Sequence, residues 1–282
     1  MLDLRYHVAS LSAVFLALIV GILVGVGISG RGFVDKSERR NFQNRIAALQ
    51  SQVDQLGAQK SLLIQQGRAD EAFAQETYPA LMHRRLQGRR VGLIVLGSSG
   101  AVGDVQQALT DAGGTTAIYR VLKLPVDAIA IRKALVGRPG FRTLENVGHE
   151  LAQEWLTGGK TPISDLVSPV IVQEQRGTTS KPLDAMVVVE AAAASDLWSR
   201  SLLTGLFDGL HTGGLPAVAA ERANAQPSLV IEWRGAGLST VDDVDTPSGK
   251  LALALLLGGA PAGSFGSKPT ADAPLPRIQP AP

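Results

Sequence analysis

The chain has 282 residues, of which 45% are hydrophobic, so it contains enough apolar side chains for at least one packed core. Its formal net charge is only +2, and Lys and Arg are not gathered in the way that a nucleic-acid-binding surface requires. No residue is Cys, which excludes disulfides, thiolate metal sites and Cys nucleophiles.

The first predicted element is a membrane-spanning helix within residues 1–30. Residues 6–30 contain no Asp, Glu, Lys or Arg, and a helix that crosses a bilayer needs about 20 apolar residues. Apolar side chains cover every face of the segment, unlike an amphipathic helix of a soluble domain. A cleaved signal peptide is the alternative, but its apolar stretch is usually about 7–15 residues long. We therefore expect an uncleaved, single-span membrane anchor.

Small residues recur at every fourth position along this helix, from residue 9 to residue 29. Ala17, Gly21 and Gly25 form the centre of this stripe, and a Gly-x-x-x-Gly step allows two transmembrane backbones to approach closely. Transmembrane helices are rich in Ala and Gly in any case, but a stripe of this length favours dimerisation.

The bases that flank the helix bear on its orientation. Arg5 precedes the helix, whereas five bases follow it between residues 31 and 45. A count of bases alone places the C-terminal side in the cytoplasm. That rule weakens where a long domain follows the helix, so charge alone leaves the orientation open.

Residues 31–88 are predicted to form a helical stalk. From residue 42 to residue 63, apolar residues alternate four and three positions apart, as in a heptad repeat, and Lys60 takes the one polar position. β-Branched residues at position a with Leu at position d favour a parallel two-stranded coiled coil. A single amphipathic helix packed on its own domain is the alternative. Because a transmembrane dimer would hold two strands side by side, we expect a coiled-coil homodimer. Its seam contains Ile46, Leu49, Val53 and Leu56.

Residues 89–258 are predicted to form an α/β domain, a mainly parallel sheet flanked by helices. Strands at 91–96 and 115–122 enclose a helix at 102–112, which is a β-α-β unit. Further strands are predicted at 185–190, 217–220 and 239–244, and further helices at 126–136, 141–156, 196–210 and 251–257. Thr246 before Pro247 predicts a capped start for the last helix. Residues 259–282, rich in Pro, Ala and Gly, are predicted to be a disordered tail.

A glycine-rich turn follows the first strand of this domain. Gly97, Gly100 and Gly103 lie where an α/β sheet binds phosphate groups, which makes the turn a possible ligand site. The spacing is neither G-x-G-x-x-G nor a P-loop, and a tight β-α turn explains the glycines equally well.

A second candidate is an acidic cluster near the end of the strand at 239–244. Asp242, Asp243 and Asp245 could hold a hard cation such as Mg²⁺. The alternative is that they are turn residues and helix caps. No arrangement of nucleophile and base stands out, so we expect a protein that is not an enzyme.

Soft metal ions such as Cu(I) prefer thiolate, thioether and imidazole ligands. The chain has three Met and four His, and among them only Met82 and His83 are neighbours. These two are weak candidates for a metal pair. The residues alone argue against a dedicated copper site, and no resident cofactor is expected.

Two parts of the chain resemble a known family. The opening Leu2-Asp3-Leu4-Arg5-Tyr6-His7-Val8-Ala9-Ser10-Leu11, with the apolar run at 13–18 and the Gly21-x-x-x-Gly25 step, is similar to the actinobacterial MctB family of copper transporters. So is the late block Ser239-Thr240-Val241-Asp242-Asp243-Val244-Asp245-Thr246-Pro247-Ser248-Gly249. The resemblance covers roughly residues 1–258 and implies copper transport or homeostasis at the cell envelope, with the domain outside the cytoplasmic membrane. The chain also resembles SteB-like envelope proteins, which are tied to cell division through a partner protein. The alternative function is therefore a dimeric scaffold that presents its domain to an envelope or division partner.

Overall fold

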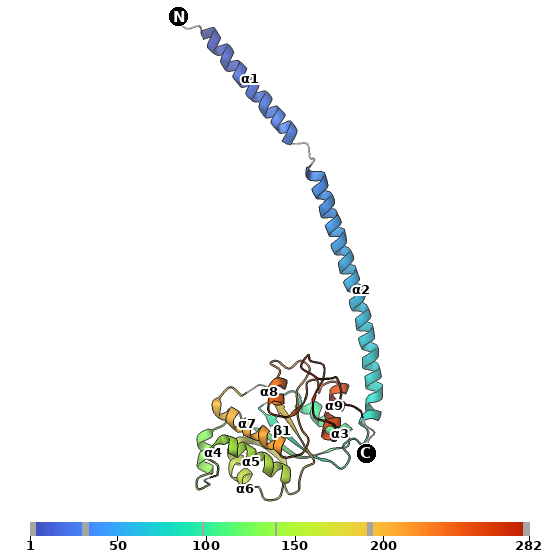
Figure 1. The fold of residues 1–282 in the computed structure, drawn as a ribbon, viewed down its shortest axis with the longest axis vertical. Helices are drawn as coiled ribbons and strands as arrows, with labels where there is room; N and C mark the ends of the chain where they lie inside the picture. Colours follow the sequence, from blue (N-terminus) through green and yellow to red (C-terminus); the bar gives the residue numbers. More distant parts are fainter. Residues whose placement is uncertain (1–3, 30–33, 98, 139, 191–193, 279–282) are drawn as a thin grey trace. The chain divides into compact units, whose positions relative to one another are not determined.

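The computed structural model describes residues 4–29, 34–97, 99–138, 140–190 and 194–278 (Figure 1). Its internal contacts divide the chain into two compact units, Met1–Ala69 and Asp70–Pro282. The first unit contains helix α1 (Leu4–Ser29) and the greater part of helix α2 (Val34–Met82), and the last turns of α2 belong to the second unit.

The helices of the first unit expose their large apolar side chains. Within α1, Tyr6–Gly27 is long and apolar enough to cross a membrane, and no other helix in the described residues is. Phe15 and Leu16 are 60% and 66% exposed. In α2 the predicted seam is exposed in the same way, with Ile46 54% and Leu49 60% accessible. This unit therefore covers neither its apolar helix nor its heptad seam by itself.

The second unit is built on a seven-stranded sheet in the order β3-β2-β1-β4-β5-β6-β7. Neighbouring strands are parallel except for β2 and β3, which are antiparallel. The strands are β1 (Arg90–Leu96), β2 (Thr115–Leu122), β3 (Val172–Gly177), β4 (Ala185–Glu190), β5 (Ala217–Ala220), β6 (Ser239–Val241) and β7 (Ser264–Phe265). The predicted α/β class with a mainly parallel sheet is confirmed.

Helices cover both faces of this sheet (Figure 1). Residues of β1 alternate between the two cores, because successive side chains of a strand point to opposite faces. One face packs against α4 (Ala128–Ala134), α5 (Leu144–Thr157), α6 (Pro162–Ile171), α7 (Leu197–Thr212) and α8 (Val230–Gly235). The other packs against α3 (Val102–Asp111), α9 (Pro247–Leu257) and the end of α2.

The start of helix α9 agrees with its prediction from the sequence. Thr246 caps α9, since its Oγ1 accepts a hydrogen bond from the backbone N–H of Gly249 at 3.0 Å, and Pro247 opens the helix. The strand predicted at 239–244 ends earlier, at Val241. Four elements were not predicted, namely α6, β3, α8 and β7.

The structure corrects two predicted boundaries. Met82 and Leu86 were assigned to the stalk but are fully buried in the core of the second unit. The prediction that the chain is disordered from residue 259 onward is also wrong. Strand β7 lies within it, Phe265 is 9% exposed, and a bridge links Phe265 to Ala273. Polar anchors, described below, hold this segment where bulky apolar residues are scarce.

Candidate functional site

The carboxyl ends of the parallel strands meet at one edge of the sheet, where α/β proteins usually bind ligands. The turn that begins at Gly97 follows β1, Glu221 follows β5, and Asp242 follows β6. Both predicted candidates, the glycine turn and the acidic cluster, are therefore brought to this edge.

The glycine turn lies beside an ion pair whose arginine is partly exposed. Gly97 has a φ of +74°, a conformation that glycine adopts readily. A Cβ at Gly100 would lie 3.6 Å from the guanidinium of Arg222, whose Nε binds Asp104 Oδ2 at 2.9 Å. Gly103 lies in the first turn of α3 with open space beside it. The side chain of Arg222 thus lies next to the predicted ligand turn and already pairs with a carboxylate.

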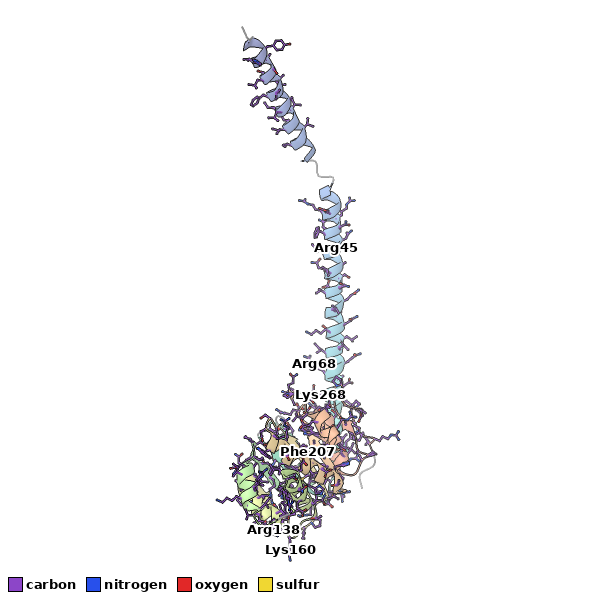
Figure 2. All side chains as sticks on the ribbon, turned by 60° about the vertical axis from the view of Figure 1, so that its left-hand side comes forward. Arg45, Arg68, Arg138, Lys160, Phe207 and Lys268 are labelled. Carbon is purple, nitrogen blue, oxygen red and sulfur yellow. The ribbon has the colours of Figure 1, made fainter. Side chains whose placement is uncertain are left out.

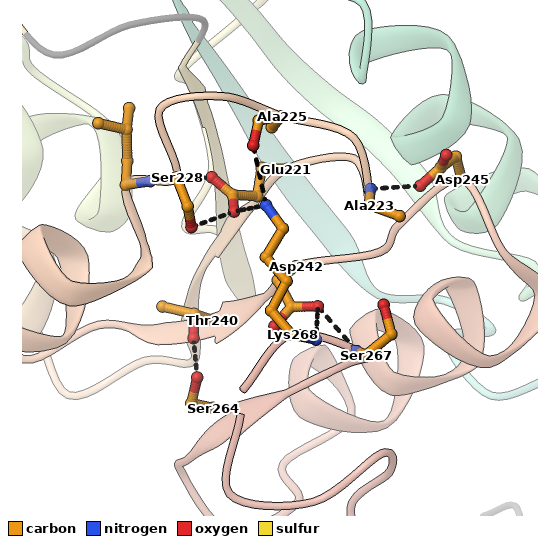
Figure 3. Close-up of polar contacts among 11 residues, drawn as sticks. Glu221, Ala223, Ala225, Ser228, Thr240, Asp242, Asp245, Ser264, Ser267 and Lys268 are labelled. Atoms are coloured by element: carbon orange, nitrogen blue, oxygen red, sulfur yellow. Dashed lines mark hydrogen bonds and ion pairs between the residues drawn. The ribbon is translucent and has the colours of Figure 1, made fainter. Parts of the chain in front are cut away.

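Asp242 is fully buried and binds the backbone of residues 263–273, which we call the C-terminal strap (Figure 3). Its Oδ1 accepts hydrogen bonds from the N–H groups of Ser267 and Lys268 at 2.8 and 3.2 Å, whereas Oδ2 has no partner among the described residues. Hydrogen bonds to an ionised acceptor are stronger than neutral ones. One carboxylate therefore fixes the centre of the strap.

Glu221 forms the second anchor and is 2% exposed. It accepts hydrogen bonds from Ser228 Oγ at 2.6 Å and from the N–H of Leu229 at 3.0 Å, and it forms an ion pair with the ammonium group of Lys268 (Figure 3). Lys268 also donates to the carbonyl of Ala225 at 3.2 Å. The strap is thus joined to the loop after β5 by an ion pair between the buried Glu221 and the partly buried Lys268.

Asp243 and Asp245 have different surroundings from Asp242. Asp245 accepts a hydrogen bond from the N–H of Ala223 at 2.8 Å. Asp243 is 4% exposed, and its burial, followed by the charges of Asp242 and Asp245, raises its pKa to about 6. In the described part of the chain, no group of three or more His, Asp or Glu is placed to hold a metal ion. The three carboxylates therefore do not form the candidate cation site, and Asp242 and Asp245 bind backbone N–H groups instead, as the alternative of turn residues implies.

The predicted soft-metal ligands are also separated. Met82 is fully buried in the core, whereas His83, the next residue, is exposed. His149 Nδ1 lies 2.8 Å from Asp208 Oδ2, and His211 Nδ1 lies 2.9 Å from the carbonyl oxygen of Gly237. These described His and Met side chains do not converge.

Glu221 and Lys268, which form an ion pair at this edge, were not predicted from the sequence. A signal for Glu221 was present, because an acidic residue directly follows the apolar strand Ala217–Ala220. Lys268 stands in a segment with few bulky residues, and its partner is 47 positions away.

The fold and this edge define an α/β protein with an N-terminal helix of membrane-spanning length, whose sheet edge binds its own chain. The sequence matches the family described as "Copper transport outer membrane protein, MctB" over residues 1–123 and 146–276, so the chain belongs to this family. Proteins named copper transporter MctB from Mycobacterium tuberculosis (strain H37Rv) and Mycobacterium bovis are each 25% identical over 319 aligned positions. The alignments cover 95% of this chain and 96% of each relative. The family expected from the sequence is confirmed.

Proposed function

We propose that this protein is a membrane-anchored, non-catalytic component of copper transport or copper homeostasis in the cell envelope. Family membership carries this proposal, because the family description and the names of both relatives specify copper transport. Helix α1 supports the anchoring, since Tyr6–Gly27 has the length and composition of a membrane span. A single helix cannot enclose a pore, so the protein acts within an assembly and does not form the conducting path alone.

Cellular copper content tests this proposal. Cells that lack the protein, and the same cells supplied with the full chain, are grown under copper load and their metal content is measured. We expect removal of the protein to change the copper content and the full chain to restore it. A chain shortened by residues 1–33 should fail to restore it. Equal copper content in all strains would contradict a role in copper handling.

We further propose that two chains associate through their N-terminal helices. The small-residue stripe around Gly21 and Gly25 supports contact within the membrane, and a Cβ added at either glycine would meet nothing within 4 Å in the single chain. The exposed heptad seam supports contact beyond the membrane. The homodimer would carry two copies of the α/β domain.

The alternative function is a scaffold that presents the domain to an envelope or division protein. The separation of Met82 from His83 favours it, because a tight Cu(I) site needs several soft ligands that converge. Competition between the purified full chain and a Cu(I) chelator distinguishes the two roles. We expect binding no tighter than that of an unrelated protein. Stoichiometric binding that is lost in a Met82→Leu, His83→Ala double variant would establish direct copper handling instead.

We place the α/β domain outside the cytoplasm, as the family resemblance implies. The absence of Cys allows a clean test with one introduced thiol. Lys160 is exposed, and Lys160→Cys should react with a membrane-impermeant maleimide in intact cells (Figure 2). Reaction only after lysis would place the domain in the cytoplasm.

A further inference from the structure

A polar cavity of about 360 Å³ lies between helix α6 and the edge strand β3, far along the sheet from the C-terminal strap. Ser164 and Ser168 of α6 line it together with Thr161, the residue that precedes the helix; the three are spaced three or four residues apart and so lie on one side. Arg120 of strand β2 also lines the cavity. The volume falls within the range of small-molecule pockets, roughly 300–1,000 Å³.

Arg120 is a buried cation without an acidic partner. It occupies the same face of β2 as Ile118 and Leu122, which belong to the core beneath α5 and α6, and it is 6% exposed. Its Nη1 donates to the backbone carbonyls of Tyr119 at 2.9 Å and Arg176 at 2.7 Å. Both acceptors are neutral, and no carboxylate of the described residues forms an ion pair with this guanidinium. Burial lowers the pKa of Arg120 accordingly.

The two carbonyl bonds use only one of the guanidinium nitrogens. Nε and Nη2 form no hydrogen bond within the described chain, and Arg120 lines the cavity, so their N–H groups are available to a ligand bound there. A guanidinium presents its N–H groups in a planar fork that matches the two oxygens of a carboxylate. A buried charge is unfavourable unless it is paired. An anion bound here would pair with the charge of Arg120 and so relieve part of that cost.

A hydroxyl relay supplies a further donor. The indole N–H of Trp155 donates to Ser164 Oγ at 2.9 Å, and Ser164 Oγ lies 3.2 Å from Ser168 Oγ. Because Ser164 receives the indole proton, it can pass its own to Ser168, which leaves the Ser168 hydroxyl free to donate into the cavity.

The acidic residues of the cavity limit the charge of its ligand. Asp165 and Glu174 line it as well, but both are exposed, and each already has a partner. Asp165 accepts from Thr161 Oγ1 at 3.0 Å, and Glu174 pairs with Arg176. Their charges would repel a multiply charged anion such as phosphate more strongly than a single carboxylate.

We propose that this cavity binds a small organic acid with one carboxylate, held by the free N–H groups of Arg120 and by the hydroxyl of Ser168. The rest of the ligand occupies the polar space along α6. Hydroxyl and amide groups line this space, so hydroxy acids fit it better than purely apolar acids.

The test is a titration of the purified full chain in detergent micelles with lactate, acetate and inorganic phosphate at constant ionic strength. Unfolding is followed by Trp fluorescence, since Trp155, Trp198 and Trp233 all lie in the second unit. We expect lactate to raise the unfolding midpoint saturably and phosphate to have a weaker effect. Phosphate binding as tight as lactate binding would overturn the monocarboxylate assignment. The absence of any saturable acid effect on the wild-type chain would overturn the site.

Variants locate the effect. Arg120→Lys, which removes the planar fork, should weaken lactate binding about tenfold or more. Ser168→Ala leaves the bonds of Arg120 to the β2 and β3 carbonyls intact and should weaken binding about threefold, so the site stays testable if the Arg120 variant does not fold. Arg138→Lys is the matched control, because Arg138 is exposed and does not line the cavity (Figure 2). An equal loss of affinity in Arg138→Lys, or none in Arg120→Lys and Ser168→Ala, would contradict the proposal.

Discussion

The two units of this chain differ in where they place side chains that are costly to leave without a partner. In the first unit, large apolar residues such as Leu23 and Leu49 are 69% and 60% exposed. In the second, even charged residues such as Glu221 and Asp242 are almost completely buried and bonded within the chain. On the proposal above, lipid or another chain covers the apolar surface of the first unit, whereas the second buries its core and these charged groups within its own chain. Substitutions in the first unit should change association, and substitutions in the second should change folding.

The largest expected effect is on the C-terminal strap. Gly266 has a φ of +140°, and an added Cβ would lie 2.1 Å from Asp242 Oδ1. Gly266→Ala therefore has to displace the strap from the carboxylate that anchors it. We expect the free energy of unfolding of the domain to fall by about 4 kcal/mol, measured by denaturant titration with Trp fluorescence.

The matched control is Gly235→Ala in helix α8. A Cβ there would meet nothing within 4 Å, and Ala is the better helix former, so this variant should be neutral or slightly more stable. If Gly266→Ala were equally harmless, the strap would not be a tightly held part of the second unit.

The next effect concerns the buried carboxyl group of Asp243. Its native pKa is about 6, above the unfolded value of about 3.9, so between these values the native state binds more protons than the unfolded state. The stability that the protonated form contributes is fully present below about pH 4, and it is lost as the pH rises to about 6. Asp243→Asn carries no charge and should remove this loss.

The difference between variant and wild type isolates this group. Above about pH 6, Asp243→Asn should be more stable than the wild type by up to about 3 kcal/mol, and the difference should vanish below about pH 4. Denaturant unfolding at several pH values measures it. Parallel pH profiles for the two proteins would mean that Asp243 is not held in a costly buried state.

A smaller effect is expected in the membrane helix, where association and not folding should change. Gly21→Leu with Gly25→Leu places bulky side chains on the small-residue stripe and should weaken transmembrane association about tenfold. Gly27→Leu places one such side chain off the stripe, and all three glycines have open space within the single chain. A membrane two-hybrid assay compares them. Equal weakening by both variants would remove the stripe from the contact.

Hydrophobic pattern explains which elements were predictable. The strands β1 and β4 were predictable because nearly all of their residues are apolar and buried. Helix α1 was predictable because its sequence has the length and composition of a membrane span. Strand β3 was not, since Val172 is its one buried residue and the rest are exposed. It pairs with β2 through backbone bonds that leave no mark in its side chains.

The sites were harder to predict than the fold because their contacts join distant positions. Asp242 binds the N–H of Ser267, 25 positions away, and a backbone N–H carries no sequence signal. Arg120 offered a clearer sign, a lone charge within the otherwise uncharged strand Thr115–Leu122. The alternation of side chains along the strand predicts that Arg120 faces a core. It does not predict that Arg120 would lie beside a cavity and have no carboxylate partner.

The central claim, that the first unit is completed by a second copy of the chain, is tested most directly by cross-linking in native membranes. Leu49→Cys places a thiol in the predicted seam, and Ser51→Cys places one on the outer side of the same helix. The chain has no other Cys. We expect mild oxidation to convert Leu49→Cys efficiently to a disulfide-linked dimer while Ser51→Cys stays mainly monomeric. Equal cross-linking of the two variants, or none in Leu49→Cys, would contradict the paired-helix account.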